Sequence, residues 1–169
     1  MKKIILIISV LFCSLSSFSQ QIVKDTVTTY YLIRHAEKDS TNPKNTNPKL
    51  NKKGLERAQK WANVFKNIHF NSVYATNYHR TKQTAKPVAE KDNLEIEIYN
   101  PKKMYTSQFQ KETKGQNILI VGHSNTTPFF ANKILGEYLY EQIAANNNGN
   151  LYIITVTKNK KTAVLLNIN

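Results

Sequence analysis

The stretch from Tyr30 to Lys38 constrains the fold most, because an apolar run stops abruptly there at Arg34 and His35. Four consecutive apolar or aromatic residues, Tyr30–Ile33, are typical of a strand buried on both faces, as in a parallel sheet. Ligands of open α/β sheets bind outside the carboxyl ends of the strands. At such an end Arg34 would be a fixed cation that holds phosphoryl oxygens, and His35 a neutral nucleophile. The stretch alone fits a structural histidine beside a surface arginine equally well.

Strand and helix patterns alternate along the rest of the chain. Strands are expected over 27–34, 72–75, 94–99, 117–121, 151–157 and 162–168, and helices over 51–66, 80–91, 101–114 and 126–135. The alternation predicts a single three-layer α/β domain with a mostly parallel sheet, helices on both faces and a C-terminal hairpin. Helical spacing predicts one buried stripe of Leu55, Ala58, Ala62 and Phe65, and another of Thr84, Ala85, Val88 and Ala89. A loop over 39–49 follows the first strand end, where long loops are usually functional.

At two further places a basic side chain follows the end of an expected strand, as Arg34 and His35 do. His123 follows the apolar run 118–121 after Gly122, and Arg80 lies at a helix start just after the strand 72–75. In a parallel sheet these ends converge on one rim. The helix after Asn125 presents free N–H groups and a positive dipole end to an anion. Two arginines, two histidines and a helix N-terminus around one point indicate a phosphate site.

The chain resembles the histidine phosphatase superfamily, with its phosphoglycerate mutase-like fold, over about residues 28–135. The resemblance rests on Leu32-Ile33-Arg34-His35-Ala36-Glu37, on Leu50-Asn51-Lys52-Lys53-Gly54, on Tyr74-Ala75-Thr76 with Arg80 and Gln83-Thr84-Ala85, and on Val121-Gly122-His123-Ser124. Four such pieces in this order are far more specific than an Arg-His pair alone.

The resemblance implies a metal-independent phosphatase of the histidine acid type, without a cofactor. His35 would be the nucleophile that is transiently phosphorylated. His123 would be the second catalytic residue, which binds the phosphoryl group and stabilises its oxygens. Arg34 and Arg80 would bind the phosphoryl group, while Asn125 would cap the helix or touch the phosphate. The expected substrate is a small phosphorylated molecule or phosphohistidine.

The proton donor to the leaving group is the open part of this interpretation. Many family members carry an acidic residue after the strand that here holds Glu95 and Glu97, but residues 99–110 contain no carboxylate. Glu37 is a candidate donor; the alternative, which we favour, is that it pairs with a nearby cation or caps local backbone. Thr41 replaces an asparagine common in the family, which weakens the case for mutase-type substrate contacts. A missing acid favours good leaving groups, such as phosphohistidine or anhydrides, over alkyl phosphates.

The first residues have the pattern of a secretory signal. Lys2 and Lys3 precede an apolar run from Ile4 to Phe12 and a serine-rich stretch, so residues 1–19 are expected to be removed and 20–169 to form the mature domain. The run is too short for a stable membrane anchor. The single cysteine, Cys13, lies inside this segment, so the mature chain is expected to hold no disulfide. The protein is therefore expected to be exported, to the periplasm or beyond.

The net charge of the chain indicates which class of ligand it favours, but it does not identify the ligand. The net charge is +13, and losing Lys2 and Lys3 leaves +11, which favours anionic ligands. The lysines are scattered and do not alternate with aromatic residues, so nucleic acid is not an expected partner. Two rivals to a phosphatase remain: a catalytically weak phosphate- or polyanion-binding module on the same fold, and a metal hydrolase using His35, Glu37, His79 and His123. The latter lacks a metal-ligand spacing.

Overall fold

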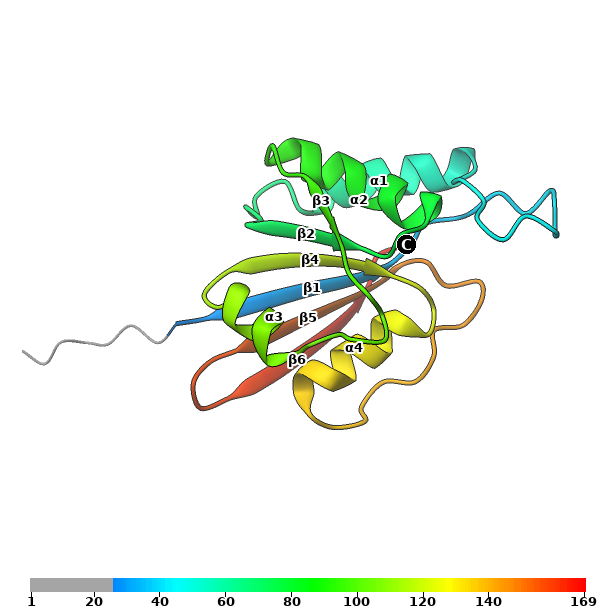
Figure 1. Ribbon diagram of the computed structural model, residues 1–169. Helices are drawn as coiled ribbons and strands as arrows, with labels where there is room; N and C mark the ends of the chain where they lie inside the picture. Colours follow the sequence, from blue (N-terminus) through cyan, green and yellow to red (C-terminus); the bar gives the residue numbers. More distant parts are fainter. Residues whose placement is uncertain (1–25) are drawn as a thin grey trace, which may run out of the picture.

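The computed structural model describes residues 26–169 and shows ten helices and strands in this part of the chain (Figure 1). In chain order they are β1 (Thr28–Arg34), α1 (Lys52–Val64), β2 (Ser72–Ala75), α2 (His79–Lys91), β3 (Ile96–Ile98), α3 (Ser107–Glu112), β4 (Asn117–Gly122), α4 (Thr126–Leu135), β5 (Asn150–Val156) and β6 (Lys161–Asn167). The expected signal segment, 1–19, and Cys13 lie outside the described residues. No helix within 26–169 is long and apolar enough to cross a membrane.

One six-stranded sheet organises the domain, with the strand order β3-β2-β4-β1-β5-β6. The first four of these strands run parallel, and β5 and β6 complete the sheet as an antiparallel hairpin. The predicted α/β class, the mostly parallel sheet and the C-terminal hairpin are therefore confirmed, although each hairpin strand begins one residue earlier than expected. The apolar runs of β1 and β4 lie side by side at the centre of the sheet, with Ile33 opposite Val121 and Arg34 opposite Gly122.

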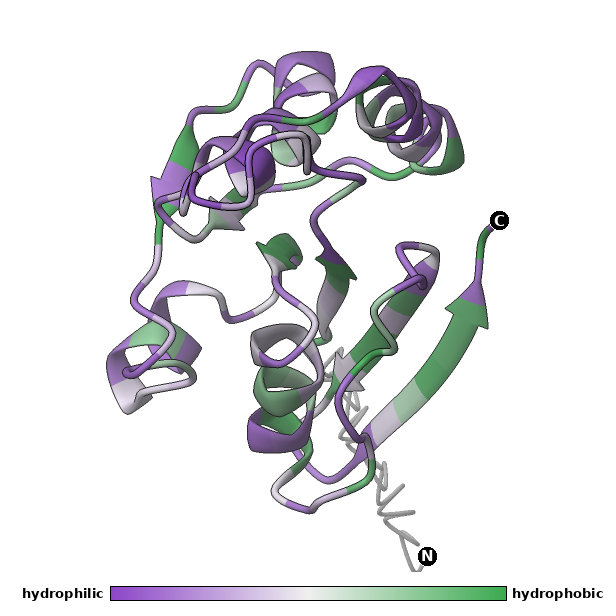
Figure 2. Ribbon diagram, turned by 90° about the vertical axis from the view of Figure 1, so that its right-hand side faces the viewer, coloured by the Kyte–Doolittle hydropathy of each residue, from purple (hydrophilic) through white to green (hydrophobic). Residues whose placement is uncertain are grey.

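Helices cover both faces of the sheet, as the alternation predicted. In Figure 1, α1 and α2 lie above the strands, α4 lies below β4 and β1, and α3 is drawn in front of the sheet; Phe109 of α3 packs in the same cluster as Phe130 of α4. Successive residues of β1 point to opposite faces of the sheet. Ile33 packs with Trp61 and Phe65 on the α1 side. Leu32 packs with Phe130 and Ile134 of α4 on the other side. Figure 2 shows the apolar residues concentrated in the strands and on the sides of the helices that face them.

The buried stripe of α1 differs from the predicted one by its first residue. Leu55 is 51% exposed, whereas Gly54 is buried along with Ala58, Trp61 and Ala62. Gly54 faces inward because the helix passes the chain just after β1, where a Cβ at this position would lie 2.1 Å from the carbonyl oxygen of Glu37. A larger residue there would displace backbone, so Gly54 takes the first position of the stripe in place of Leu55, while Ala58, Ala62 and Phe65 are buried as predicted. The stripe predicted for α2 is buried as expected.

The helix expected over 101–114 is much shorter in the structure. It begins at Ser107, where the hydroxyl of Thr106 caps it by accepting from the N–H of Phe109 at 3.2 Å. Tyr105 just before it has a φ of 54°, in the left-handed region, which a right-handed helix cannot contain. The preceding residues form turns that carry the chain from β3 across the edge of the sheet.

Candidate active site

The ends of β1 and β4 place the two histidines side by side. The N–H of His35 donates to the carbonyl of Gly122 at 2.9 Å, which extends the pairing of the strands by one residue. His123 follows Gly122, and the ring centroids of His35 and His123 lie 5.3 Å apart. In Figure 1 this edge is the right-hand end of the sheet, beside the start of α4. The convergence expected from separate strand ends is therefore present.

His35 is held as a neutral imidazole with one nitrogen free. Its side chain is buried, and Nδ1 lies 2.7 Å from the carbonyl oxygen of Ala36. A carbonyl only accepts, so Nδ1 carries the proton and Nε2 keeps its lone pair. Burial, followed by the positive field of His123, Arg80 and Arg34, lowers the pKa of His35 to about 3. The ring is thus unprotonated at neutral pH and fixed in the tautomer that a nucleophile requires.

His123 has the opposite tautomer. Its Nδ1 lies 3.4 Å from Nη2 of Arg80, which only donates, so Nδ1 accepts and Nε2 donates to the hydroxyl of Thr76 at 2.8 Å. Burial and then the charges of Arg80 and Arg34 lower the pKa of His123 to about 4. An anion that neutralises those charges raises this pKa again, so His123 can gain a proton when a phosphate binds.

Two guanidinium groups complete the site, and both have N–H groups without a protein partner. Nη1 of Arg34 is fixed by the carbonyl oxygens of Ala144, Ala145 and Asn147 at 2.9–3.0 Å. Nε of Arg34, and both Nε and Nη1 of Arg80, are buried with no hydrogen-bond partner among residues 26–169. Buried donors of this kind are rarely left unpaired in proteins, which points to an anion that accepts from them.

Tyr78 positions one of these guanidiniums. The Cζ of Arg80 lies 4.4 Å from the ring centroid of Tyr78, and the same ring contacts the edge of His123 at 5.0 Å between centroids. Tyr78 immediately precedes α2, so the helix start carries both the cation and the ring on which it rests.

These groups line a cavity of about 480 Å³ at the carboxyl edge of the sheet. Its lining residues are Arg34, His35, Lys38, Tyr78, Arg80, Pro101, His123, Ser124, Asn125, Thr126 and Gln142. Five of them are basic and none carries a carboxylate. Asn125 lies at the wall, but its side-chain oxygen already accepts from the N–H of Thr126 at 2.9 Å at the start of α4. The cavity is therefore suited to a compact anion.

Glu37 does not belong to this lining. Its carboxylate accepts from Nε and Nη2 of Arg57 at 2.9–3.0 Å, and Nζ of Lys53 lies 3.7 Å away. Although burial opposes the shift, the hydrogen bonds and charge of Arg57 and the charge of Lys53 lower the pKa of Glu37. The geometry therefore matches the ion-pair alternative, in which the carboxylate of Glu37 is engaged by Arg57 and does not line the cavity.

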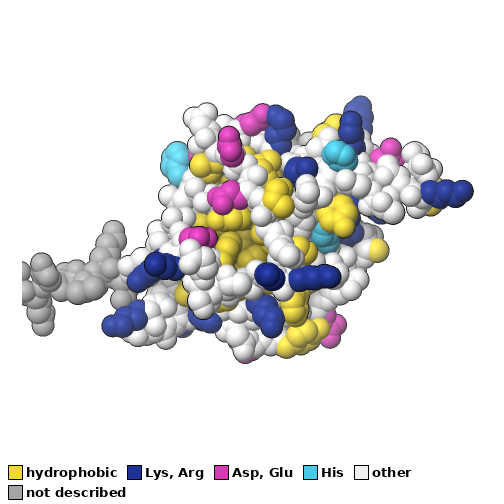
Figure 3. All heavy atoms as spheres, viewed as in Figure 1, with side chains coloured by type: hydrophobic (Ala, Val, Ile, Leu, Met, Phe, Trp, Pro, Cys, Tyr) yellow, Lys and Arg dark blue, Asp and Glu magenta, His cyan; other side chains and the backbone are white. Residues whose placement is uncertain are grey.

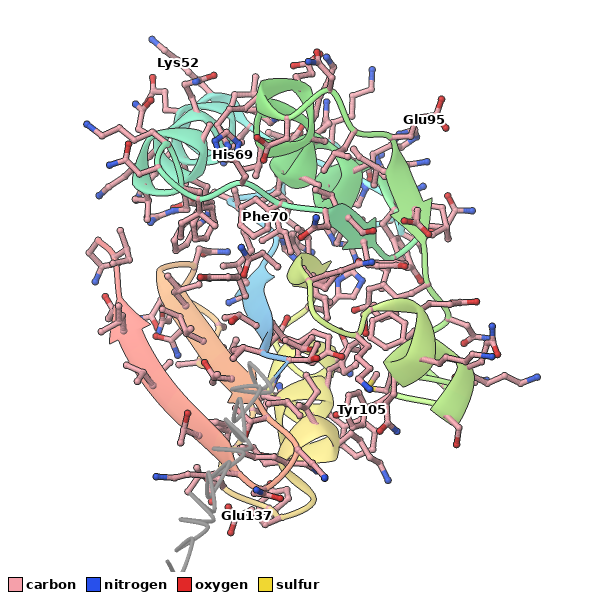
Figure 4. All side chains as sticks on the ribbon, turned by 90° about the vertical axis from the view of Figure 1, so that its left-hand side faces the viewer. Lys52, His69, Phe70, Glu95, Tyr105 and Glu137 are labelled. Atoms are coloured by element: carbon pink, nitrogen blue, oxygen red, sulfur yellow. The ribbon has the colours of Figure 1, made fainter. Side chains whose placement is uncertain are left out.

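The other carboxylates considered from the sequence are also remote. Glu95 and Glu97 are exposed, and Figure 4 shows Glu95 at the outer margin of the molecule, pointing away from it. The four residues of the metal-hydrolase alternative do not gather, since no three His, Cys, Asp or Glu side chains within 26–169 form a group that fits a metal ion.

Several lining residues were not singled out from the sequence. Lys38, Tyr78 and Gln142 line the cavity, and Asn148 donates to the carbonyl of His35 at 2.8 Å. Lys38 lies three residues after His35, and Tyr78 lies three residues after the end of β2 at Ala75. Their closeness in sequence to these strand ends could have indicated that they line the cavity. Gln142 and Asn148 come from the segment between α4 and β5, where no local pattern indicates which residues return to the site.

The fold and the cationic cavity with two histidines together define the phosphoglycerate mutase-like class. Residues 30–100 match the family model of the histidine phosphatase superfamily (branch 1). That match over residues 30–100 and this fold together support membership of the histidine phosphatase superfamily, which comprises phosphatases and mutases. No curated protein sequence matched the chain.

Solved structures agree with the fold. The protein histidine phosphatase SixA complexed with tungstate gives a TM-score of 0.65 at 14% identity, covering 82% of this chain and 96% of that one. A phosphoglycerate mutase from Bacillus anthracis gives 0.63 at 16% identity, covering 84% and 93%. An alpha-ribazole phosphatase from Shigella flexneri gives 0.63 at 17% identity, covering 83% and 98%. At these identities the likeness concerns the fold alone.

Proposed function

We propose that the protein is an exported phosphatase that hydrolyses phosphomonoesters or phosphoramidates through a phosphohistidine intermediate on His35. One observation carries this proposal: the neutral imidazole of His35, with its free Nε2, shares a cavity with the unpaired guanidinium donors of Arg34 and Arg80. A nucleophile beside pre-positioned donors for the phosphoryl oxygens is what phosphoryl transfer requires.

The reaction follows from the roles of these groups. The lone pair of His35 Nε2 forms a bond to phosphorus while the bond from phosphorus to the leaving group breaks, and the leaving group departs with that electron pair. Arg34 and Arg80 hold the phosphoryl oxygens, and a protonated His123 donates to one of them. A water oxygen then forms a bond to phosphorus while the bond from phosphorus to Nε2 of His35 breaks and its electron pair returns to Nε2. A proton from the water passes to solvent, and inorganic phosphate leaves with His35 neutral again.

The cavity narrows the substrate class. Since no carboxylate lines it, the leaving group departs without a proton from a neighbouring carboxylic acid. Aryl phosphates, anhydrides and phosphohistidine have such leaving groups, whereas alkyl phosphates do not. The structural likeness to SixA, described as a protein histidine phosphatase and solved with tungstate, supports a phosphoramidate substrate and an oxyanion in the cavity.

Export is the part of the proposal that rests on the sequence alone. Residues 1–19 have the order of basic start, apolar run and small residues that a secretory signal has. N-terminal sequencing of the protein from its native host is expected to begin at Gln20 or Gln21. An N-terminus at Met1 would contradict export by this route.

One observation favours a second candidate function. The cavity is strongly basic and lacks an acid, which also suits a module that binds phosphate or a polyanion and turns it over weakly or not at all. Such a module would bind inorganic phosphate as tightly as the enzyme would.

Turnover of 4-nitrophenyl phosphate separates the two, because its good leaving group needs little acid assistance. We expect hydrolysis that persists in chelator, is abolished in His35→Ala, and is retained in Glu37→Gln. His79→Ala is the matched control, since His79 adjoins Arg80 but is exposed and outside the cavity lining. Binding of phosphate without turnover in the wild type would overturn the phosphatase and favour the binding module.

A further inference from the structure

A second hollow adjoins the phosphate cavity at the start of α4. It has a volume of about 250 Å³ and is lined by Asn125, Thr126, Pro128, Phe129, Asn132, Tyr138, Tyr140 and Gln142. Three of these residues, Asn125, Thr126 and Gln142, also line the phosphate cavity. The two spaces are therefore neighbours that share three lining residues.

The hollow has a different chemistry from the cavity beside it. All eight of its lining residues are uncharged, while the phosphate cavity contains five basic residues. Phe129 is 48% exposed and Tyr138 is 76% exposed, which leaves two aromatic rings facing solvent at its wall. Hydrophobic side chains reach the surface over α4 in Figure 3, and Glu137, labelled in Figure 4, is not part of the lining. Large exposed apolar side chains next to a polar site commonly mark a binding surface.

The hollow is built in advance of any ligand. Asn132 of α4 is buried, and its Oδ1 accepts from the N–H groups of Leu139 and Tyr140 at 3.0 and 2.9 Å, while its Nδ2 donates to the carbonyl of Tyr140 at 2.7 Å. The ring of Tyr140 also packs edge-on against Tyr152 of β5, with centroids 4.8 Å apart. These contacts fix the backbone of residues 139–140 against α4, so little backbone order has to be gained when a ligand binds.

We infer that this hollow is the leaving-group subsite of the phosphatase and that it takes a neutral aromatic group. This inference rests on the proposed function, because it assigns the occupant by continuity with the phosphate cavity. The size is suitable, since an apolar cavity of roughly 150 Å³ already holds a benzene molecule. Aromatic rings pair favourably with others in edge-to-face or offset geometry, which the rings of Phe129 and Tyr138 can offer. A neutral ring also matches the absence of charge in the lining.

The test compares 2-naphthyl phosphate with acetyl phosphate, which has the same phosphoryl group and a small leaving group. In Phe129→Ala and Tyr138→Ala we expect KM for 2-naphthyl phosphate to rise about fivefold to tenfold, with kcat/KM for acetyl phosphate changed less than about twofold. Phe129→Leu retains apolar area without the ring and is expected to give an intermediate KM. Leu139→Ala is the matched control, because Leu139 is 54% exposed and adjacent to Tyr138 but does not line the hollow.

The outcomes separate this inference from the proposed function. Since Phe129 and Tyr138 are at the surface, the variants are expected to fold, which a urea midpoint checks. Unchanged KM values for 2-naphthyl phosphate, or equal changes for both substrates, would overturn the aromatic subsite while leaving the phosphatase in place. Failure of the wild type to hydrolyse either substrate would instead overturn the proposed function.

Discussion

Acid should destabilise the protein at a pH where its carboxylates are still ionised, because of the two histidines in the cavity. The folded-state pKa is about 3 for His35 and about 4 for His123, both below the ordinary value of 6.5. Well above pH 6.5 neither the folded nor the unfolded chain binds a proton at these rings. Below it the unfolded chain takes up protons that the folded chain cannot, so stability is lost as the pH falls from 6.5 toward the folded-state values.

The magnitude depends little on how low the folded-state values lie. Between pH 7.5 and 5.5 each ring stays neutral in the folded protein, while in the unfolded chain it passes through its ordinary pKa. Linkage then gives a loss of about 1.3 kcal/mol for each histidine, or about 2.6 kcal/mol for both. The lowered pKa of Glu37 and that of Asp92 act in a more acidic range, below their ordinary values of 4.5 and 3.8, and do not enter this window.

Urea unfolding at pH 7.5 and 5.5 measures this loss directly. Relative to the wild type, His35→Gln is expected to be less sensitive to acid by about 1.3 kcal/mol, which is a difference of roughly 0.5–1 M in the shift of the urea midpoint. His123→Gln should behave similarly, and the double variant should lose both contributions. Equal acid sensitivity in the wild type and His35→Gln would refute the conclusion that His35 is held neutral by burial and its cationic neighbours.

Three further outcomes follow from the contacts. Gly54→Ala should lower the free energy of unfolding by about 2 kcal/mol, because its Cβ would meet the Glu37 carbonyl, whereas Glu56→Ala on the exposed side of α1 should change it little; a urea midpoint measures both. Arg80→Lys should reduce kcat/KM for 4-nitrophenyl phosphate about 100-fold in steady-state assays, since a lysine cannot reproduce the fork of donors. Glu37→Gln should cost about 1–3 kcal/mol of stability, by leaving Arg57 without its charge partner, yet keep kcat within about twofold; a large loss of kcat at unchanged stability would restore Glu37 as the proton donor.

The fold could be predicted from the sequence where local patterns and burial agree. The runs in β1 and β4 are apolar throughout because both faces of the central strands are covered, and their length and abrupt polar ends gave their limits to within a residue. Leu55 shows where this reasoning stops. It has the right spacing to be buried, but Gly54 takes the inward position in the first turn, where it passes close to the Glu37 carbonyl, and only the three-dimensional packing reveals this.

The residues of the candidate site also fall into those that the sequence could predict and those that it could not. His35, Arg34, Arg80 and His123 lie next to strand ends, so parallel-sheet topology was enough to bring them together on one rim. Gln142 comes from a connecting segment without a repeating pattern, and its return to the cavity depends on long-range packing. The isolated sequence also left two roles open for Glu37, and it took the position of Arg57, twenty residues later, to show which partner its carboxylate has.

The central claim is that His35 carries the phosphoryl group between substrate and water. Wild-type protein mixed rapidly with acetyl phosphate, quenched in alkaline denaturant and analysed by peptide mass spectrometry tests it most directly. We predict a transient, acid-labile phosphoryl group on His35, which decays as inorganic phosphate accumulates and is absent in His35→Ala. Hydrolysis that proceeds with a phosphoryl group on another residue, or at an undiminished rate in His35→Ala, would contradict the account.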